Sequence, residues 1–225
     1  MSQPVLFIIP GACSLGSMIS LEWLDIPYQI GITTPEIRAT PNFRKVNPTG
    51  KVGALKDDDI VVGENLAILL YLVDKNPNSS IGFRVGAPER VKMYQWLSYL
   101  SSTLHPAFSQ VRFPGRFVST TKTEDFQELA IQRLIAVLSY IESSFLASGL
   151  LIADHPTAVD AQAYGLLRWI RLLSELEISI KLEDYPSIAK FMTIMEQLPA
   201  VQNALAIENQ EQVNNSKFNG YFNFN

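Results

Sequence analysis

The chain has 225 residues, of which 47% are apolar and 18% charged, and its net charge is −4; this is ordinary for one large or two small globular domains and argues against general disorder. Without a basic stripe to neutralise phosphates, nucleic acid is not an expected partner, and no apolar run approaches the roughly 20 residues that span a bilayer. The single cysteine cannot form an internal disulfide, so we expect a cytoplasmic protein.

Residues 4–75 alternate between strand and helix patterns. Strands are expected at residues 4–9, 28–32, 50–55 and 59–62, with a hairpin turn at Asp57-Asp58, and helices at residues 14–24 and 64–75. The order β-α-β and then β-β-α predicts a small mixed sheet with helices packed on it. Gly53 lies inside one expected strand, where a glycine usually marks a bulge, a bend or a close approach of another molecule.

Strand patterns stop after residue 88, and helices are expected at residues 87–104, 123–149, 157–173, 185–198 and 199–205. Gly149 is the predicted stop of the second of these helices, and Thr157 with Asp160 forms a predicted capping box. The turn-forming segment 76–88 is typical of a linker. We therefore predict an α/β domain at 1–77, an all-helical domain at 88–208, and a tail at 209–225 with no assigned structure.

Cys13 is the first candidate for chemistry, because it lies in the expected loop between the first strand and the first helix. Unpaired N–H groups and the positive end of the helix dipole favour a thiolate at such a place. The alternative is a small buried cysteine that only packs. A redox cycle that needs two cysteines is excluded.

Two further groups each allow two interpretations. Glu64 and Asn65 open an expected helix, where N–H groups can bind a carboxylate or where the two side chains simply cap the helix. Ser98 and His105 share one helix face with Ser101 and Ser102, and this face either lines a cleft or meets water. One cysteine and two separated histidines give no ligand cluster, so no metal is expected.

Four stretches, in order, resemble the cytosolic glutathione S-transferases, most of all the bacterial beta class. They are IIPGACSLGSMISLEWLDIPY, FRKVNPTGKVGAL, VVGENLAILLYLVDK and HPTAVDAQAYGLLRW, and the resemblance runs from about residue 5 to residue 205. It implies a thioredoxin-like α/β N-terminal domain followed by an all-α helical C-terminal domain. It also implies glutathione as co-substrate, a homodimer, and a role in detoxification.

The resemblance also implies roles for individual residues, with Cys13 and His105 as the catalytic pair. Cys13 corresponds to the class cysteine beside the glutathione sulfur, and His105 to a histidine of the helical domain near it. For binding, the backbone of Val52 would pair with the cysteinyl part of glutathione, and Lys51 would reach the glycyl carboxylate.

The remaining binding positions show departures from the family pattern. Glu64 and Asn65 would hold the γ-glutamyl carboxylate, although a serine is usual where Asn65 stands; Ser98 stands where an asparagine is common, and Pro106 where a lysine is common. Gly53 occupies the position of the family's cis-proline. Either its surroundings hold a cis peptide there, or the bond is trans and the Val52 backbone is redirected.

The expected function is conjugation of the glutathione thiol to an electrophilic, hydrophobic substrate, with thiol exchange through Cys13 as a further activity. Phe108, Phe113 and Phe117 are expected to contribute to the apolar pocket for that substrate. The alternative is a non-catalytic binding or regulatory protein on the same scaffold, since the departures fall at ligand positions and a fold does not fix a function.

Overall fold

A computed structural model describes residues 3–24, 26–213 and 217–224. In that part of the chain the strands are β1 (Val5–Ile8), β2 (Tyr28–Ile32), β3 (Ala54–Asp57), β4 (Ile60–Gly63) and β5 (Phe218–Tyr221). The α-helices are α1 (Leu15–Trp23), α2 (Pro35–Ala39), α3 (Pro41–Val46), α4 (Asn65–Lys75), α5 (Pro88–Tyr99), α6 (His105–Arg112), α7 (Thr123–Glu142), α8 (Ala158–Leu167), α9 (Ile170–Glu175), α10 (Pro186–Glu196) and α11 (Pro199–Glu208). A π-helical turn (Leu100–Leu104) joins α5 to α6, and 3-10 turns lie at Pro114–Arg116, Thr120–Lys122 and Leu182–Asp184.

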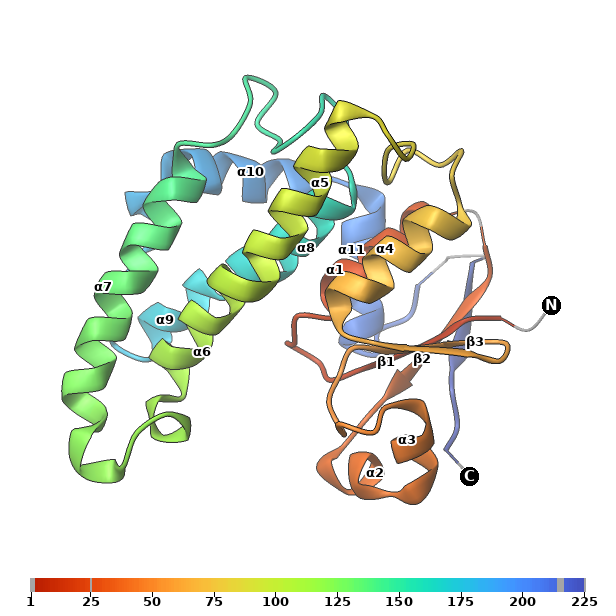
Figure 1. Cartoon of the computed structure of the whole chain (residues 1–225), viewed down its shortest axis with the longest axis horizontal. Coiled ribbons are helices and arrows are strands. Elements are labelled where there is room, and N and C mark those ends of the chain that lie inside the picture. The colour runs from red at the N-terminus through yellow and green to blue at the C-terminus, as the bar shows by residue number, and fades with distance from the viewer. Residues whose placement is uncertain (1–2, 25, 214–216, 225) are drawn as a thin grey trace.

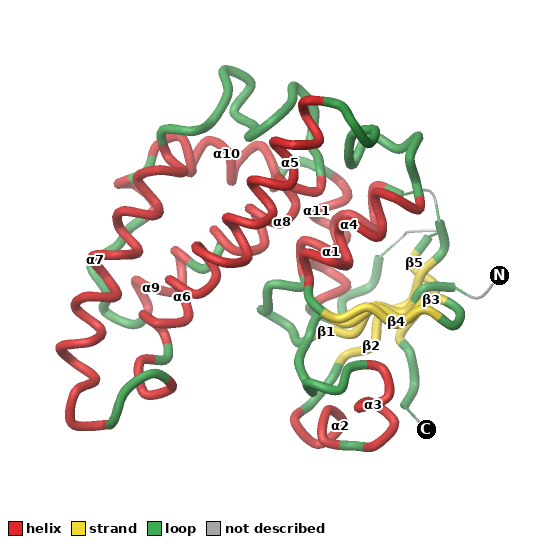
Figure 2. The backbone as a smooth tube through the Cα atoms, in the orientation of Figure 1, coloured by secondary structure: helices red, strands yellow, loops and turns green. Residues whose placement is uncertain are grey.

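The strands form one mixed sheet in the order β4-β3-β1-β2-β5. Strand β1 is central; it runs parallel to β2, with Val5 opposite Gln29, and antiparallel to β3. Helices α1 and α4 cover one face of this sheet, and α2 and α3 lie on the other (Figure 1; Figure 2). The predicted thioredoxin-like arrangement of a mixed sheet with helices on it is confirmed.

The β3–β4 hairpin turns at Asp58, as predicted, and the left-handed backbone of this residue (φ 53°) makes the turn tight. Strand β3 starts later than expected. It begins at Ala54 rather than at residue 50, so Gly53 precedes the strand instead of interrupting it.

Helices α2 and α3 fill residues 35–46, where no helix or strand was predicted. Each follows a Thr-Pro pair, in which the threonine caps the helix and the proline occupies its first turn. The hydroxyl oxygens of Thr34 and Thr40 accept hydrogen bonds from the backbone N–H groups of Ile37 and Phe43, at 3.3 and 3.2 Å. The sequence therefore contains the features that predict these two helices, namely a capping threonine followed by proline at the start of each.

The two parts of the chain meet along α1, whose residues Leu15 to Glu22 are all buried. Helix α1 packs on α4 and also on α8 and α11 of the helical part. Glycines allow the close crossing of α1 and α8: a Cβ at Gly16 would lie 2.7 Å from the Gln162 Cα, and one at Gly165 would lie 3.1 Å from the Gly16 nitrogen. The first turn of α1 is thus fixed against the helical part.

The helix expected at 123–149 ends earlier, at Glu142. The hydroxyls of Ser143 and Ser144 donate to the Tyr140 carbonyl at 2.9 and 2.6 Å, so side chains occupy an acceptor at the end of the helix. Gly149 has φ +85° but lies in the loop beyond, so its predicted role as the helix stop is wrong. The helix expected at 157–173 is divided into α8 and α9, and its capping box of Thr157 and Asp160 is confirmed.

The tail supplies the edge strand β5, which runs parallel to β2. Beyond it, Phe222 and Phe224 pack on the face of the sheet that carries α2 and α3. Their ring centroids each lie 5.5 Å from that of Phe7, which also contacts Phe43 at 5.7 Å. The tail is therefore part of the folded sheet, although its residues are mainly polar.

Among the described residues, no helix is both long and apolar enough to span a membrane.

Candidate functional site

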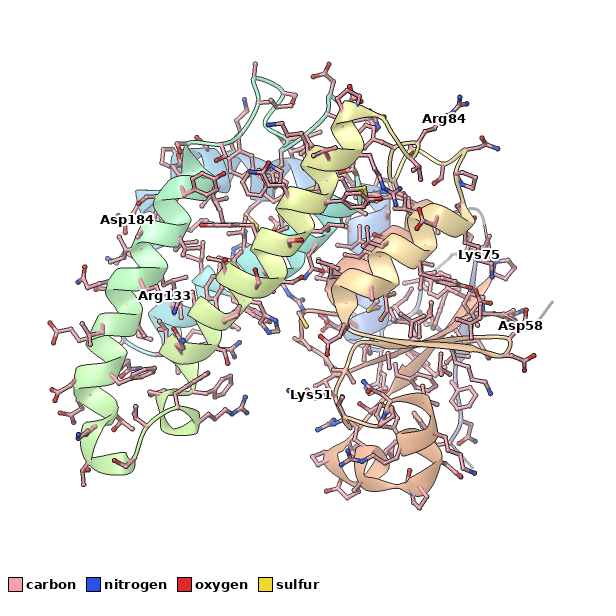
Figure 3. The ribbon with its side chains drawn as sticks, in the orientation of Figure 1. Lys51, Asp58, Lys75, Arg84, Arg133 and Asp184 are labelled. Carbon is pink, nitrogen blue, oxygen red and sulfur yellow. The ribbon has the colours of Figure 1, made fainter. Side chains whose placement is uncertain are left out.

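A cleft of about 580 Å³ lies between the sheet part and the helical part. The sheet part lines it with the β1–α1 loop (residues 9–13), Arg38 and residues 50–52. The helical part lines it with His105, Ser109, Arg112, Phe113, Arg116 and Trp169. Figure 3 shows Lys51 on the side of the sheet part that faces the helices. The predicted residues Cys13, Lys51, Val52 and His105 are thus brought together, although they are far apart in sequence.

Three side chains hold the loop that presents Cys13 by its consecutive carbonyl groups. The indole Nε1 of Trp169 donates to the Gly11 oxygen at 2.9 Å, and Arg168 Nη2 donates to the Ala12 oxygen at 3.0 Å. Asn65 Nδ2 donates to the Cys13 oxygen at 3.1 Å. Because carbonyls that are paired in this way resist movement, the position of the Cys13 backbone is fixed from both parts of the chain.

Arg168 and Trp169 lie between α8 and α9, and sequence reasoning did not find them. Arg168 forms a two-pronged ion pair with Glu208 of α11, at 2.6 and 2.9 Å, in a nearly buried environment. Planar bidentate pairing of this kind fixes the guanidinium geometry. In the sequence an Arg-Trp pair inside an apolar helix carries no signal that it would reach back to a loop about 155 residues earlier.

The Cys13 thiol is buried and protonated at neutral pH. Burial raises its pKa from the ordinary 9.0 to about 11, and the negative charge of Glu64 acts in the same direction. The Cys13 backbone N–H and the charge of Arg168 lower the pKa but do not compensate for the burial. The thiolate-favouring effect expected for a helix start is therefore present but smaller than the cost of desolvation.

His105 reaches the cleft because the helix changes pitch just before it. The segment Leu100–Leu104 is π-helical, and the His105 N–H donates to the Leu100 carbonyl five residues earlier. Pro106 has no N–H and its ring would clash with the carbonyl four residues before it, which accounts for the wider turn. The predicted common face of Ser98 and His105 is thereby broken: His105 lines the cleft, whereas Ser98 is exposed outside it.

The His105 ring lies 5.3 Å from the ring of Trp169. Burial lowers the pKa of its imidazole below the ordinary 6.5, the charge of Lys51 adds to this, and Glu64 opposes it. The ring is consequently neutral at pH 7, so one ring nitrogen can donate a hydrogen bond and the other can accept one. The influence of Glu64 and Lys51 places both charges within electrostatic reach of His105.

The segment before β3 is held by its own turn. Asn47 Nδ2 donates to the Lys51 oxygen at 2.9 Å, and the Gly50 N–H donates to the Asn47 oxygen at 2.9 Å. The Val52–Gly53 peptide bond is cis. Of the two geometries that the sequence left open at Gly53, the structure has the cis form.

Glu64 and Asn65 start α4 behind the cleft lining. Glu64 is exposed and has a left-handed backbone (φ 67°), so it ends the β4 segment and directs the chain into the helix. The Asn65 side chain is committed internally: besides the Cys13 carbonyl it bonds Gln162 of α8 and accepts a hydrogen bond from the Ser17 hydroxyl at 2.5 Å. Because this side chain is occupied, a ligand at the start of α4 would bind the backbone N–H groups rather than the Asn65 amide.

The three phenylalanines expected in the substrate pocket have different places. Phe113 lines the cleft. Phe108 is fully buried, with its ring 5.6 Å from that of Trp169, and supports the pocket from behind. Phe117 stacks on Phe126 at 5.8 Å and is not among the residues that line the cleft. Within the described residues there is also no group of three or more metal-ligating side chains.

Comparisons with known proteins agree with this fold. Residues 18–80 match the family described as the glutathione S-transferase N-terminal domain. A glutathione transferase structure from Methylococcus capsulatus is 30% identical over 92% of this chain and 99% of its own, with a TM-score of 0.80. A beta-class enzyme from Sphingomonas chungbukensis is 28% identical over 91% and 98% of the two chains (TM-score 0.77). A sphingomonad glutathione S-transferase complexed with glutathione is 29% identical over the same shares (TM-score 0.79).

The fold, a thioredoxin-like sheet joined to a helical part, is thus shared with bacterial glutathione transferases over nearly the whole chain. The chain belongs to the glutathione S-transferase family, and the family predicted from its motifs is confirmed.

Proposed function

We propose that this protein is a glutathione transferase that binds glutathione in the cleft beside Cys13 and conjugates it to an electrophile. The observation that carries the proposal is that Cys13, Lys51, Val52 and His105 line one cleft between the two parts of the chain. The glutathione bound by the sphingomonad relative supports the same ligand here.

Glutathione would lie along the sheet side of the cleft. The backbone of Val52 offers a donor and an acceptor to the cysteinyl residue, and the Lys51 ammonium attracts the glycyl carboxylate. The γ-glutamyl end would extend toward Glu64 and the first N–H groups of α4, where the carboxylate is stabilised by the helix start and the ammonium by the Glu64 charge. Ser98 is exposed and is not among the residues that line the cleft, so this arrangement gives it no contact with glutathione.

In the reaction the glutathione thiol loses its proton to solvent and its sulfur donates an electron pair to the electrophilic carbon. A C–S bond forms, and the leaving group departs with the bonding pair; in an addition to a double bond, the pair moves to the neighbouring carbon, which takes a proton. The Cys13 thiol, protonated because its pKa is raised, is suited to donate a weak hydrogen bond to the glutathione thiolate rather than to act as the nucleophile itself.

Calorimetry and thermal unfolding test the binding step. At a glutathione concentration about 100 times Kd, binding adds about 2.7 kcal/mol of stability, which for a chain of this size raises Tm by roughly 5–10 °C. Lys51→Gln should weaken binding about 3- to 10-fold, and Lys92→Gln, an exposed lysine on α5, serves as the matched control. No heat and no Tm shift at millimolar glutathione would overturn the proposal.

Conjugation of a standard electrophile tests the activity. Binding of glutathione without any conjugation would favour the non-catalytic alternative on the same scaffold. As further parts of the proposal, the protein is a homodimer in the cytoplasm, with detoxification as its role; light scattering on the purified chain tests the dimer, and a molar mass of one chain would contradict it.

A further inference from the structure

The cleft carries positive charge on both walls. The sheet part contributes Arg38 and Lys51, and the helical part contributes Arg112 and Arg116, whereas no acidic side chain is among the lining residues. This concentration of cations stands out in a chain whose net charge is −4. A narrow cleft lined by one sign of charge attracts anions.

Arg112 and Arg116 both lie close to the ring of Phe113. The guanidinium carbon of Arg112 is 5.2 Å from the centroid of the Phe113 ring and 5.5 Å from that of Trp169, and that of Arg116 is 4.1 Å from Phe113. Among the described residues neither guanidinium has a carboxylate within ion-pair distance, and the Nε of Arg112 is buried without a hydrogen-bond partner. An aromatic face stabilises a cation only in part, so both guanidinium groups can still gain from an anion.

Three other arginines of the helical part are paired with carboxylates, whereas Arg133 donates to the Gln110 amide oxygen at 3.4 Å. Arg90, Arg168 and Arg171 each have a carboxylate at 2.5–2.6 Å. Burial also lowers the pKa of Arg112, which means that its charge is desolvated without compensation. A group in this condition gains most from an added anion.

Glutathione does not account for this pair. It has two carboxylates and one ammonium; in the proposed function its glycyl carboxylate lies at Lys51, and its γ-glutamyl end lies at the start of α4, both in the sheet part. The two arginines of the opposite wall face the space for the second substrate, together with the rings of Phe113 and Trp169.

We propose that the second substrate is an electrophile that carries a carboxylate on an aromatic or unsaturated body, with the carboxylate held by Arg112 and Arg116 and the body packed against Phe113 and Trp169. This inference rests on the proposed function and adds a carboxylate to the expected electrophilic, hydrophobic substrate. The chemical step is unchanged: the glutathione sulfur forms the C–S bond, the leaving group takes the bonding pair, and the thiol proton goes to solvent, while the carboxylate only orients the substrate.

A matched pair of electrophiles tests the inference: 4-chloro-3,5-dinitrobenzoate and its methyl ester, each with glutathione. The quantity to compare is kcat/KM divided by the uncatalysed rate constant. We expect the wild type to favour the carboxylate, and expect Arg112→Gln or Arg116→Gln to lower the carboxylate-to-ester ratio by about 10- to 100-fold, the range for one hydrogen bond to a charged group.

Arg84→Gln removes the same charge from the linker, where Figure 3 shows Arg84 pointing outward and away from Lys51, and it should leave the ratio unchanged. Preference of the wild type for the ester, or an equal ratio in all variants, would overturn the inference. A calorimetric stoichiometry of two glutathione molecules per chain, with the second lost in Arg112→Gln, would overturn it too, because the pair would then serve glutathione.

If the proposed function itself is wrong, calorimetry will show no heat with glutathione, and neither electrophile will be conjugated. Calorimetry with 3,5-dinitrobenzoate, which has no leaving group, still tests the arginine pair in that case. Binding that is at least 10-fold weaker in Arg112→Gln supports the anion site, and equal binding refutes it.

Discussion

Replacing Arg168 with methionine should destabilise the protein strongly and loosen the Cys13 loop. The side chain of Glu208 is 4% exposed and that of Arg168 is 14% exposed, so the substitution leaves a carboxylate nearly out of water without its two guanidinium bonds. The Ala12 carbonyl also loses its donor. Breaking a buried pair from one side costs about 3–5 kcal/mol, which for a chain of this size lowers Tm by roughly 6–20 °C.

The assay is urea or thermal unfolding of Arg168→Met, Glu208→Leu and the double variant. Since the double variant buries no unpaired charge, it should be more stable than the sum of the two single losses predicts, by at least about 1 kcal/mol. Arg171→Met is the matched control, because its pair with Glu196 at 2.5 Å is exposed and should contribute at most about 1 kcal/mol.

The loop itself can be followed by the reactivity of Cys13 with iodoacetamide, which should increase in Arg168→Met under native conditions. A loss below about 1 kcal/mol for Arg168→Met, or additive losses in the double variant, would refute the buried-pair argument, and unchanged Cys13 reactivity would refute the claim that the pair fixes the loop.

Three further outcomes are expected. Because the Cys13 pKa is raised to about 11, alkylation of the native chain at pH 8 should be about 100-fold slower than in the unfolded chain and should rise about tenfold per pH unit. The unfolded chain loses the thiol proton at a lower pH than the folded chain, so the contribution of Cys13 to stability is complete below pH 9 and falls between pH 9 and 11. A native thiol pKa at or below 9 would contradict this. Asn65→Ala leaves partners unpaired in α1, α8 and the loop and should cost about 2–4 kcal/mol, measured by urea unfolding against Asn78→Ala in the linker. Phe222→Ala should lower stability by about 1–3 kcal/mol in the same assay, whereas exposed Asn223→Ala should not, and equal values would mean that the tail does not stabilise the sheet.

Much of the fold was predictable from local pattern. Alternation and helical spacing identified β1, β2, the β3–β4 hairpin, α1, α4 and most of the helices after it, but not α6, which lies beyond the helix end expected at residue 104. The Thr157–Asp160 capping box was recognised because its side-chain bonds are made within one turn. The ordered motifs then indicated the family. These features depend on residues close together in the chain, so the sequence contains their physical cause.

Features that depend on distant contacts could not be predicted in this way. A polar tail shows little periodicity. It forms β5 because the edge of β2 can pair with it and because the Phe7 ring packs against aromatic side chains of the tail. The end of α7 was misplaced because serine hydroxyls, rather than a glycine, took up the Tyr140 carbonyl.

For the site, the sequence determined which residues were available: the lone Cys13, Lys51 before a strand, His105 in a helix. The tertiary structure decided the protonation state of these residues and which side chains lie beside them. Burial against the helical part sets the pKa of Cys13 above its ordinary value although the helix start acts in the opposite direction, and desolvation depends on atoms that are distant in sequence. Likewise, the packing of α6 against Trp169 places Arg112 on the wall of the cleft, beside Arg116 of the following 3-10 turn, and this placement is the basis of the proposed carboxylate site.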